Sequence, residues 1–250
     1  MKTLIFKTKS AMGAAAAERA SSLIRDAIAS RGLANIILAT GASQFEMLGS
    51  LVSAPEVDWS RVVMFHLDEY IGLPATHPAS FRKYLTERFV NQVPALKAAH
   101  FVEADLRPPA DECSRIGKLI AAHPIDAAMV GIGENGHLAF NDPPADFATE
   151  EPYIVVNLDS ACRRQQLGEG WFKSIDDVPT QAISMSIRQI MKSANIVCTV
   201  PDARKAKAVK AALEGPITNM CPSSVLREHP RCWMFLDEPA AALLDDGMTG

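Results

Sequence analysis

The chain has 250 residues and a mass of 27.0 kDa, which fits one domain of ordinary to large size. Its 48% hydrophobic and 22% charged residues are ordinary for a globular protein, and this length can bury a core without a disulfide or metal. The net charge of −4 argues against a nucleic-acid-binding protein that works through a broad basic face. We therefore expect a single domain over residues 1–250, and the alternation of predicted strands and helices described below indicates that it is an α/β domain.

The spacing of the cysteines and the length of the apolar runs indicate the cellular compartment in which the protein is expected. The five cysteines are spread singly, without the Cys-x-x-Cys or Cys/His spacing of a zinc site, so we expect free thiols and no metal. No uncharged apolar stretch approaches the roughly 18 residues of a membrane span. The apolar run Leu4–Phe6 is too short for a secretory signal. These patterns predict a cytoplasmic protein without membrane contact.

Short apolar runs alternate with helix-like stretches along the whole chain. In chain order the patterns predict a helix at 11–30, a strand at 35–39, helix 45–52, strand 61–67, helices 79–90 and 111–122, strands 125–132 and 195–200, helix 205–214 and strand 232–236. This alternation is typical of an open, mainly parallel, Rossmann-like sheet with helices on both faces. Residues 143–180 are rich in Pro, Gly and charge, and we expect them to form a lid-like excursion over the sheet.

Polar segments follow four of the predicted strands. They are Thr40–Ser43, Asp68–Tyr70, the stretch from Gly133 to Asp142, and Pro201–Lys205. Ligands of open parallel sheets bind outside the carboxyl ends of the strands. The sequence therefore predicts that these segments meet at one edge and form a ligand site.

Two of these segments favour an anion. The turn Thr40-Gly41-Ala42-Ser43 opens a predicted helix, where backbone N–H groups and the helix dipole attract negative charge. Arg204 and Lys205 fall in the first turn of another helix that Asp202 is expected to cap, where a bound anion would offset their repulsion by the dipole. The alternatives are an ordinary strand–helix turn and two cations pointing into water. Neither segment matches a nucleotide-binding motif.

The other two segments favour proton transfer. Asp68 and Glu69 follow an apolar strand, where burial can raise the pKa of a carboxyl group and make it a usable base; solvation or an ion pair is the alternative. His66 precedes them but lacks the further ligands of a metal site. His137 follows Gly136 and can carry protons both ways near neutral pH, with Asn135 and Asp142 near enough in sequence to orient it.

With these residues identified, the chain resembles the glucosamine-6-phosphate deaminases, also called isomerases, of the wider sugar-phosphate isomerase and lactonase group. Residues 65–74 (FHLDEYIGLP) are similar to the long Asp-Glu-Tyr motif of that family, and residues 131–141 (GIGENGHLAFN) are similar to its glycine–histidine motif. Residues 205–215 resemble its late lysine motif and residues 237–239 its closing motif. The likeness runs from about residue 30 to 240.

The resemblance implies a 2-amino-2-deoxyhexose 6-phosphate as substrate and no redox cofactor or metal. The loop Thr40–Ser43 and Lys205 would hold the phosphate. His137 would move the ring-oxygen proton during ring opening, and Asp68 would relay a proton from C2 to C1 before water displaces ammonia. The remaining residues carried over from the family are Asn135 and Asp142 in the catalytic set, and Glu69 and Arg163 in the substrate-binding set.

This chain departs from the family pattern in three places. Asn135 stands where many members have aspartate, and Asp142 where glutamate is usual. Family lids carry a second arginine just before paired aromatics, whereas here Gly170 precedes Trp171; Arg163 matches the first arginine, and the second has no counterpart unless Arg164 substitutes.

Two other functions remain open at the level of the sequence. A 6-phosphogluconolactonase-like hydrolase would share the glycine–histidine turn, but it lacks the Asp-Glu-Tyr-x-Gly-Leu-Pro run. A sugar-phosphate sensor would bind without turnover. In all three cases the expected partner is a small sugar phosphate, with no nucleic acid or membrane, and the sequence is compatible with a homo-oligomer.

Overall fold

A computed structural model of the chain describes residues 1–168 and 170–245. Its helices and strands in chain order are β1 (Lys2–Phe6), α1 (Lys9–Arg31), β2 (Ala34–Leu38), α2 (Phe45–Leu51), β3 (Val62–His66), β4 (Asp68–Tyr70), α3 (Phe81–Arg88), β5 (Ala98–His100), α4 (Pro109–Ala121), β6 (Ala127–Val130), β7 (Tyr153–Asn157), α5 (Ser160–Gly168), β8 (Gln181–Met185), α6 (Ile187–Met191), β9 (Ile196–Val200), α7 (Ala206–Glu214), β10 (Cys232–Asp237) and α8 (Glu238–Ala241). Every predicted element is present, with bounds that differ by no more than two residues.

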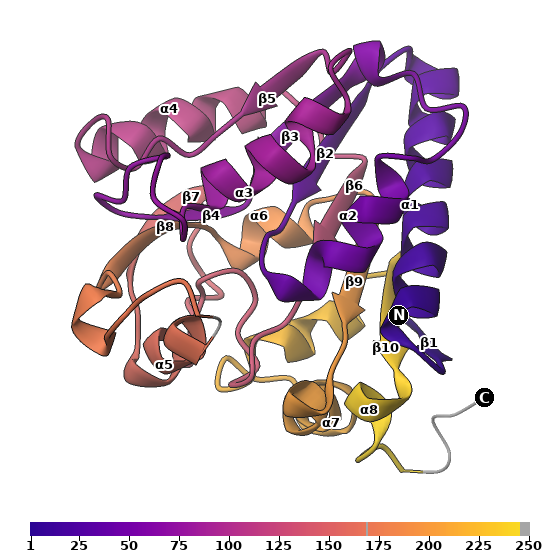
Figure 1. Cartoon of the computed structure of the whole chain (residues 1–250). Coiled ribbons are helices and arrows are strands. Elements are labelled where there is room, and N and C mark those ends of the chain that lie inside the picture. The colour runs from indigo at the N-terminus through magenta and orange to yellow at the C-terminus, as the bar shows by residue number, and fades with distance from the viewer. Residues whose placement is uncertain (169, 246–250) are drawn as a thin grey trace.

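A seven-stranded parallel sheet forms the centre of the fold, with strand order β1-β10-β9-β6-β2-β3-β5 (Figure 1). From β2 the chain first adds β3 and β5 on one side. It then returns to place β6, β9 and β10 on the other side, so the order reverses between β2 and β6. Such a reversal leaves a crevice outside the carboxyl ends of the two central strands, where ligands of this sheet type bind.

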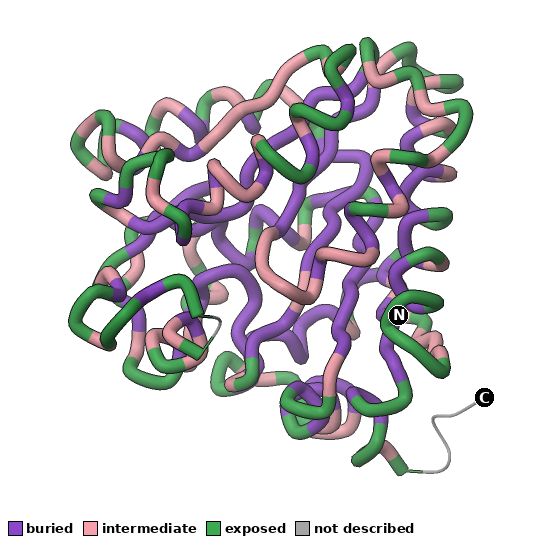
Figure 2. Tube along the Cα trace, in the orientation of Figure 1, coloured by how far each residue is buried: buried purple, intermediate pink, exposed green. Residues whose placement is uncertain are grey.

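Apolar residues on both faces of the strands explain the coverage by helices on both sides. Ile36 and Leu38 belong to one core cluster, together with residues of α1, α2 and α3. Ile37, which alternates with them along β2, belongs to the opposite cluster with residues of α4, α6 and α7. Figure 2 shows the buried trace concentrated in the central strands and on the inner sides of the helices. The expected open, mainly parallel α/β sheet is confirmed.

The longest helix, α1, begins two residues before and ends one residue after the predicted range 11–30. The hydroxyl of Thr8 accepts a hydrogen bond from the backbone N–H of Ala11 at 3.1 Å, which satisfies a donor at the helix start. Small buried residues such as Ala16 and Ala20 let the helix pack closely on the sheet. No helix among the described residues is both long enough and apolar enough to span a membrane.

A second, three-stranded antiparallel sheet, β4-β8-β7, was not predicted. Its strand β4 contains Asp68 and Glu69, whose polar side chains hide the strand pattern, and the edge strands β1 and β5 were missed as well. The segment 143–180 contributes β7 and α5, and a third apolar cluster, which includes Tyr70 and Phe172, packs between it and the rest of the fold. Its role as a lid remains a prediction.

Candidate active site

A cavity opens where the sheet order reverses, and it is lined by most of the predicted site residues. The predicted residues in its wall are Thr40, Gly41, Ala42, Ser43, Asp68, His137 and Lys205. They follow β2, β3, β6 and β9, so the carboxyl ends of four strands do deliver them to one place. The predicted residues that do not line the cavity are Asn135, Asp142, Glu69 and Arg163.

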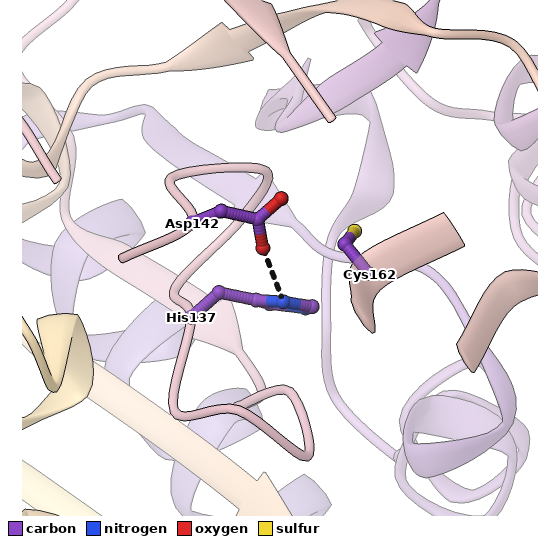
Figure 3. Close-up of side chains that lie close together, drawn as sticks. All are labelled: His137, Asp142 and Cys162. Atoms are coloured by element: carbon purple, nitrogen blue, oxygen red, sulfur yellow. Dashed lines mark hydrogen bonds and ion pairs between the residues drawn. The ribbon is translucent and has the colours of Figure 1, made fainter. Parts of the chain in front are cut away.

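His137 is held by a hydrogen-bond network in its own loop. Its Nδ1 lies 3.0 Å from Oδ1 of Asp142, as Figure 3 shows. The side chain of Asn135 donates to the same oxygen at 3.0 Å and accepts from the backbone N–H of His137 at 3.1 Å. Burial favours the neutral acid at Asp142, but the hydrogen bonds and the charge of His137 outweigh it, so the pKa of Asp142 lies below its usual value. An ionised carboxylate only accepts hydrogen bonds, so Nδ1 carries the hydrogen and Nε2 is left for a ligand.

The glycine at position 133 is required by the position of this imidazole. A methyl group on Gly133 would lie 2.3 Å from both Cε1 and Nε2 of His137, far inside contact distance. The ring therefore packs flat against the backbone of its own loop. This close approach gives a physical reason for the glycine three residues after the end of β6.

Asp68 supplies a carboxyl group of unusual basicity. It is 5% exposed, and burial together with the neighbouring charge of Glu69 raises its pKa to about 8. A carboxyl group in this range can both take and return a proton near neutral pH. The expectation that burial raises the pKa of this carboxyl group agrees with the structure.

Glu69 stands in a different environment, and the structure does not bring it to the cavity. Its fully buried carboxylate accepts hydrogen bonds from three backbone N–H groups, those of residues 70, 81 and 82, and from the hydroxyl of Ser80. Burial raises the pKa of Glu69 and these hydrogen bonds partly offset the shift. In this position Glu69 ties β4 to the start of α3, and its contact with substrate stays a prediction.

The segments predicted to bind an anion also meet in the wall of this cavity, although their local structure differs from the prediction. Gly41 has φ of +92°, a conformation that favours glycine, and a 3₁₀ turn at Ala42–Gln44 precedes α2. Lys205 is 7% exposed and lines the cavity instead of pointing into water. Arg204 is half exposed and lies 3.4 Å from a carboxylate oxygen of Glu134.

The predicted cap at Asp202 is wrong. Its side chain makes no capping hydrogen bond, and its backbone N–H donates to both oxygens of Asp237 at 3.1 Å. A 3₁₀ turn, Ala203–Lys205, precedes α7, so Arg204 and Lys205 lie before that helix and not in its first turn.

Arg163 is directed away from the cavity. Its guanidinium donates to the backbone carbonyls of Ile175 and Val178, with an Nη2–O distance of 2.9 Å to the latter, which joins α5 to the segment that follows it. These carbonyls engage Nε and Nη2, so the structure places Arg163 outside the cavity wall, and its contact with substrate stays a prediction.

Sequence reasoning missed two glutamines from the same helix that do line the cavity. Gln166 accepts a hydrogen bond from the hydroxyl of Tyr70 at 2.7 Å, and Gln165 accepts from the backbone N–H of Glu134 at 2.9 Å. A glutamine side chain carries no charge and does not titrate, so nothing in the sequence pattern distinguished this pair from an exposed helix face.

Two arrangements bear on metal binding. His66 is fully buried, its Nδ1 accepts from the backbone N–H of Val102 at 3.4 Å, and burial, followed by the charge of Arg82, lowers its pKa to about 3. It shares no metal-ligand cluster with Asp68 in the part of the chain that the structure describes. The cluster that does occur there consists of His137, Asp142 and Cys162, whose donor atoms all lie within 4.8 Å of one another.

Comparison with known proteins identifies the same family that the sequence motifs resemble. Residues 7–234 match the family described as glucosamine-6-phosphate isomerases/6-phosphogluconolactonase. A glucosamine-6-phosphate deaminase of Lactobacillus delbrueckii subsp. bulgaricus is 35% identical over 98% of this chain and 100% of that protein. One from Streptococcus pyogenes serotype M1 is 37% identical over 90% of this chain and 94% of that protein.

Solved structures show the same relationship. A monomeric glucosamine-6-phosphate deaminase superposes with a TM-score of 0.88 at 28% identity, covering 97% of this chain and 100% of that one. A 6-phosphogluconolactonase from Shewanella baltica OS155 has a TM-score of 0.79 at 19% identity over 95% and 97% of the two chains, which shows a shared fold. The chain thus belongs to the family of glucosamine-6-phosphate isomerases and 6-phosphogluconolactonases.

Proposed function

We propose that this protein is a deaminase and isomerase of a 2-amino-2-deoxyhexose 6-phosphate, which converts glucosamine 6-phosphate or a close epimer and water to fructose 6-phosphate or the matching ketose phosphate and ammonia. The observation that carries the proposal is a single cavity holding a carboxyl group with a pKa of about 8, a histidine oriented by a carboxylate and a buried lysine. The names of the full-length sequence relatives support the deaminase over the lactonase.

Two groups of residues in the cavity wall have separate roles in this proposal. Thr40–Ser43 and Lys205 hold the phosphate, because small residues and a cation suit a dianion. Nε2 of His137, left available by the bond between Nδ1 and Asp142, takes the proton of the C1 hydroxyl group and passes it to the ring oxygen as the pyranose opens.

The proton relay follows once the sugar is open. The Asp68 carboxylate removes the proton from C2 to give an enol-type intermediate, and the resulting carboxylic acid returns a proton to C1. Water adds to the imine at C2 and ammonia leaves, so no electrons are exchanged with a cofactor. General acid–base steps of this kind contribute typically about 10²–10⁴-fold each.

The decisive assay measures ammonia and ketose phosphate released from glucosamine 6-phosphate and from its galactose-series isomer. The expected result is equal amounts of both products from at least one substrate, with Asp68→Asn inactive. A lactonase would hydrolyse a sugar-phosphate lactone without releasing ammonia, and a sensor would bind a hexosamine phosphate without any product. Absence of turnover on both hexosamine phosphates, with Asp68→Asn equal to wild type on every substrate, would refute the proposal.

Three further features belong to the same proposal. We expect residues 143–180 to act as a lid over the bound sugar, which a crystal soaked with a hexosamine phosphate would reveal. The cytoplasm is the expected location, and fractionation of the source cells would establish it. The number of chains in the working enzyme is open to measurement by sedimentation, and a monomeric relative with this fold exists.

A further inference from the structure

Cys162 brings a third metal-binding side chain to the His137–Asp142 pair. Its sulfur belongs to helix α5, whereas the other two residues lie in the loops after β6, and Figure 3 shows all three side chains gathered in one place. Cys162 is 1% exposed and His137 is 7% exposed, so the group is shielded from bulk water. None of the reaction steps above uses the thiol.

The donor set selects a class of cation. One nitrogen, one carboxylate oxygen and one sulfur suit a thiophilic divalent ion such as Zn²⁺, whereas Mg²⁺ and Ca²⁺ require shells of oxygen ligands. Zinc–ligand bonds of about 2.0–2.3 Å in a tetrahedron place neighbouring donors roughly 3.3–3.7 Å apart.

The observed spacing is close to that requirement. The histidine and carboxylate donors are 3.0 Å apart, and all three donors lie within 4.8 Å. Neither Cys162 nor Asp142 lies in a strand, so closing the remaining difference does not require the sheet to move.

We propose that His137, Asp142 and Cys162 form a binding site for a thiophilic divalent cation, with Zn²⁺ as the expected ion, and that the bound ion switches the enzyme off. The binding itself is independent of the reaction assigned to the cavity, whereas the inhibition rests on the proposed function.

Binding of Zn²⁺ by these three side chains changes no oxidation state and needs no redox partner. Zn²⁺ forms bonds to sulfur, to one imidazole nitrogen and to a carboxylate oxygen, and the thiol of Cys162 releases one proton to solvent. Where the imidazole binds through Nδ1, the hydrogen that this atom shared with Asp142 moves to Nε2. The fourth ligand position of the tetrahedron is left for water.

Bound metal would stop proton transfer for a geometric reason. The lone pair through which His137 exchanges protons is then either committed to the ion or blocked by the hydrogen moved to Nε2. Asp142 also stops orienting the ring, because its oxygen coordinates the ion. A sugar entering the cavity would meet a cation at the place where its ring oxygen has to be protonated.

The direct test uses Co²⁺ as a spectroscopic probe on the metal-free full chain. Thiolate ligation produces a near-ultraviolet charge-transfer band, which we expect to saturate at one Co²⁺ per chain and to be displaced by Zn²⁺. Cys162→Ala removes the band and weakens Zn²⁺ binding by at least roughly tenfold. Cys113→Ser is the matched control, because Cys113 lies on α4 outside the cluster and its loss leaves the band unchanged.

A second variant, Asp142→Asn, and an inhibition assay test the same site. Asp142→Asn should also weaken Co²⁺ binding by at least roughly tenfold, and circular dichroism establishes that each variant is folded. In the ammonia assay, micromolar Zn²⁺ should inhibit wild type and Cys113→Ser, and a chelator should restore their activity. Cys162→Ala should resist inhibition by Zn²⁺. A thiolate band that survives in Cys162→Ala, or its absence in wild type, overturns the site. If the thiolate band is present but no ammonia is released, the metal site stands and the proposed function is refuted.

Discussion

Replacing Asp68 by asparagine should stabilise the fold while it abolishes turnover. The pKa of this carboxyl group rises from its usual 3.8 to about 8 on folding, because burial and the charge of Glu69 disfavour the carboxylate. The group therefore destabilises the fold increasingly as pH rises from about 4 towards 8. Asparagine is neutral and nearly isosteric, so it avoids that cost.

The magnitude follows from proton linkage. A pH of 7 is about three units above the ordinary pKa of an aspartate carboxyl group, and it is still below the pKa of Asp68 in the folded protein. Each unit corresponds to about 1.36 kcal/mol, which gives about 4 kcal/mol, an upper value because relaxation and water penetration reduce the penalty. For a chain of this length, 1 kcal/mol shifts Tm by roughly 2–4 °C, so Asp68→Asn should raise Tm by on the order of 10 °C at pH 7.

The assay is thermal unfolding of wild type and Asp68→Asn between pH 4 and pH 8.5. The gap in Tm should widen as pH rises and close near pH 4. Asp142→Asn is the matched control of opposite sign, because a folded pKa below the usual value stabilises the protein at neutral pH and this contribution is lost as pH falls. An Asp68→Asn variant that is less stable than wild type at pH 8, or a gap that does not change with pH, would contradict the reasoning.

Three further predictions concern the cavity wall and the lid. Lys205→Ala should raise KM for the sugar phosphate about 10–100-fold in steady-state assays, since it removes a charged hydrogen bond to phosphate, and should change kcat by only a few-fold. Gly133→Ala should lower kcat about 100-fold while circular dichroism stays native, because its methyl group displaces the ring of His137. Arg163→Ala should make residues 175–178 more accessible to hydrogen exchange and leave phosphate inhibition unchanged, because its guanidinium binds backbone carbonyls.

Each of these has a specific contrary outcome. A large loss of kcat with an unchanged KM in Lys205→Ala would place the lysine in the chemistry instead of in binding. Full activity of Gly133→Ala would show that the ring of His137 can move without consequence. A rise in the inhibition constant for phosphate in Arg163→Ala would return that arginine to the substrate.

The sheet and the position of the site followed from the sequence because both depend on local patterns. Apolar runs such as 35–39 sit between turn residues, and the polar groups that follow them must meet wherever parallel strands end. The pair Asp68 and His137 was found in this way. The three-residue strand β4 was not, because its polar side chains face long-range partners that no local period reveals.

The differences between the predicted and the observed surroundings of these side chains share one cause, which is that charged side chains were assigned by type and not by partner. Glu69 and Arg163 carry charge and flank the site in sequence, yet backbone groups from distant segments satisfy both of them. Asp202 has the residue type of a cap, but its backbone N–H is bound by Asp237. Gln165 and Gln166 were overlooked because only tertiary structure turns this face of α5 towards the cavity.

The turn Thr40–Ser43 and the loop that contains His137 follow the adjacent central strands β2 and β6. This placement has a consequence for how the substrate specificity of the enzyme can be changed. The ladder that pairs Leu38 with Met129 holds the two loops in register through backbone hydrogen bonds, which no side-chain replacement removes. The segment from 143 to 180 is joined to the remainder by the pairing of β7 with β8, by the apolar cluster that includes Tyr70 and Phe172, and by Ala145 and Tyr153 in the main core. Exchanging that segment should therefore alter which sugars are accepted while the catalytic centre keeps its dimensions, so new specificities can be sought there first.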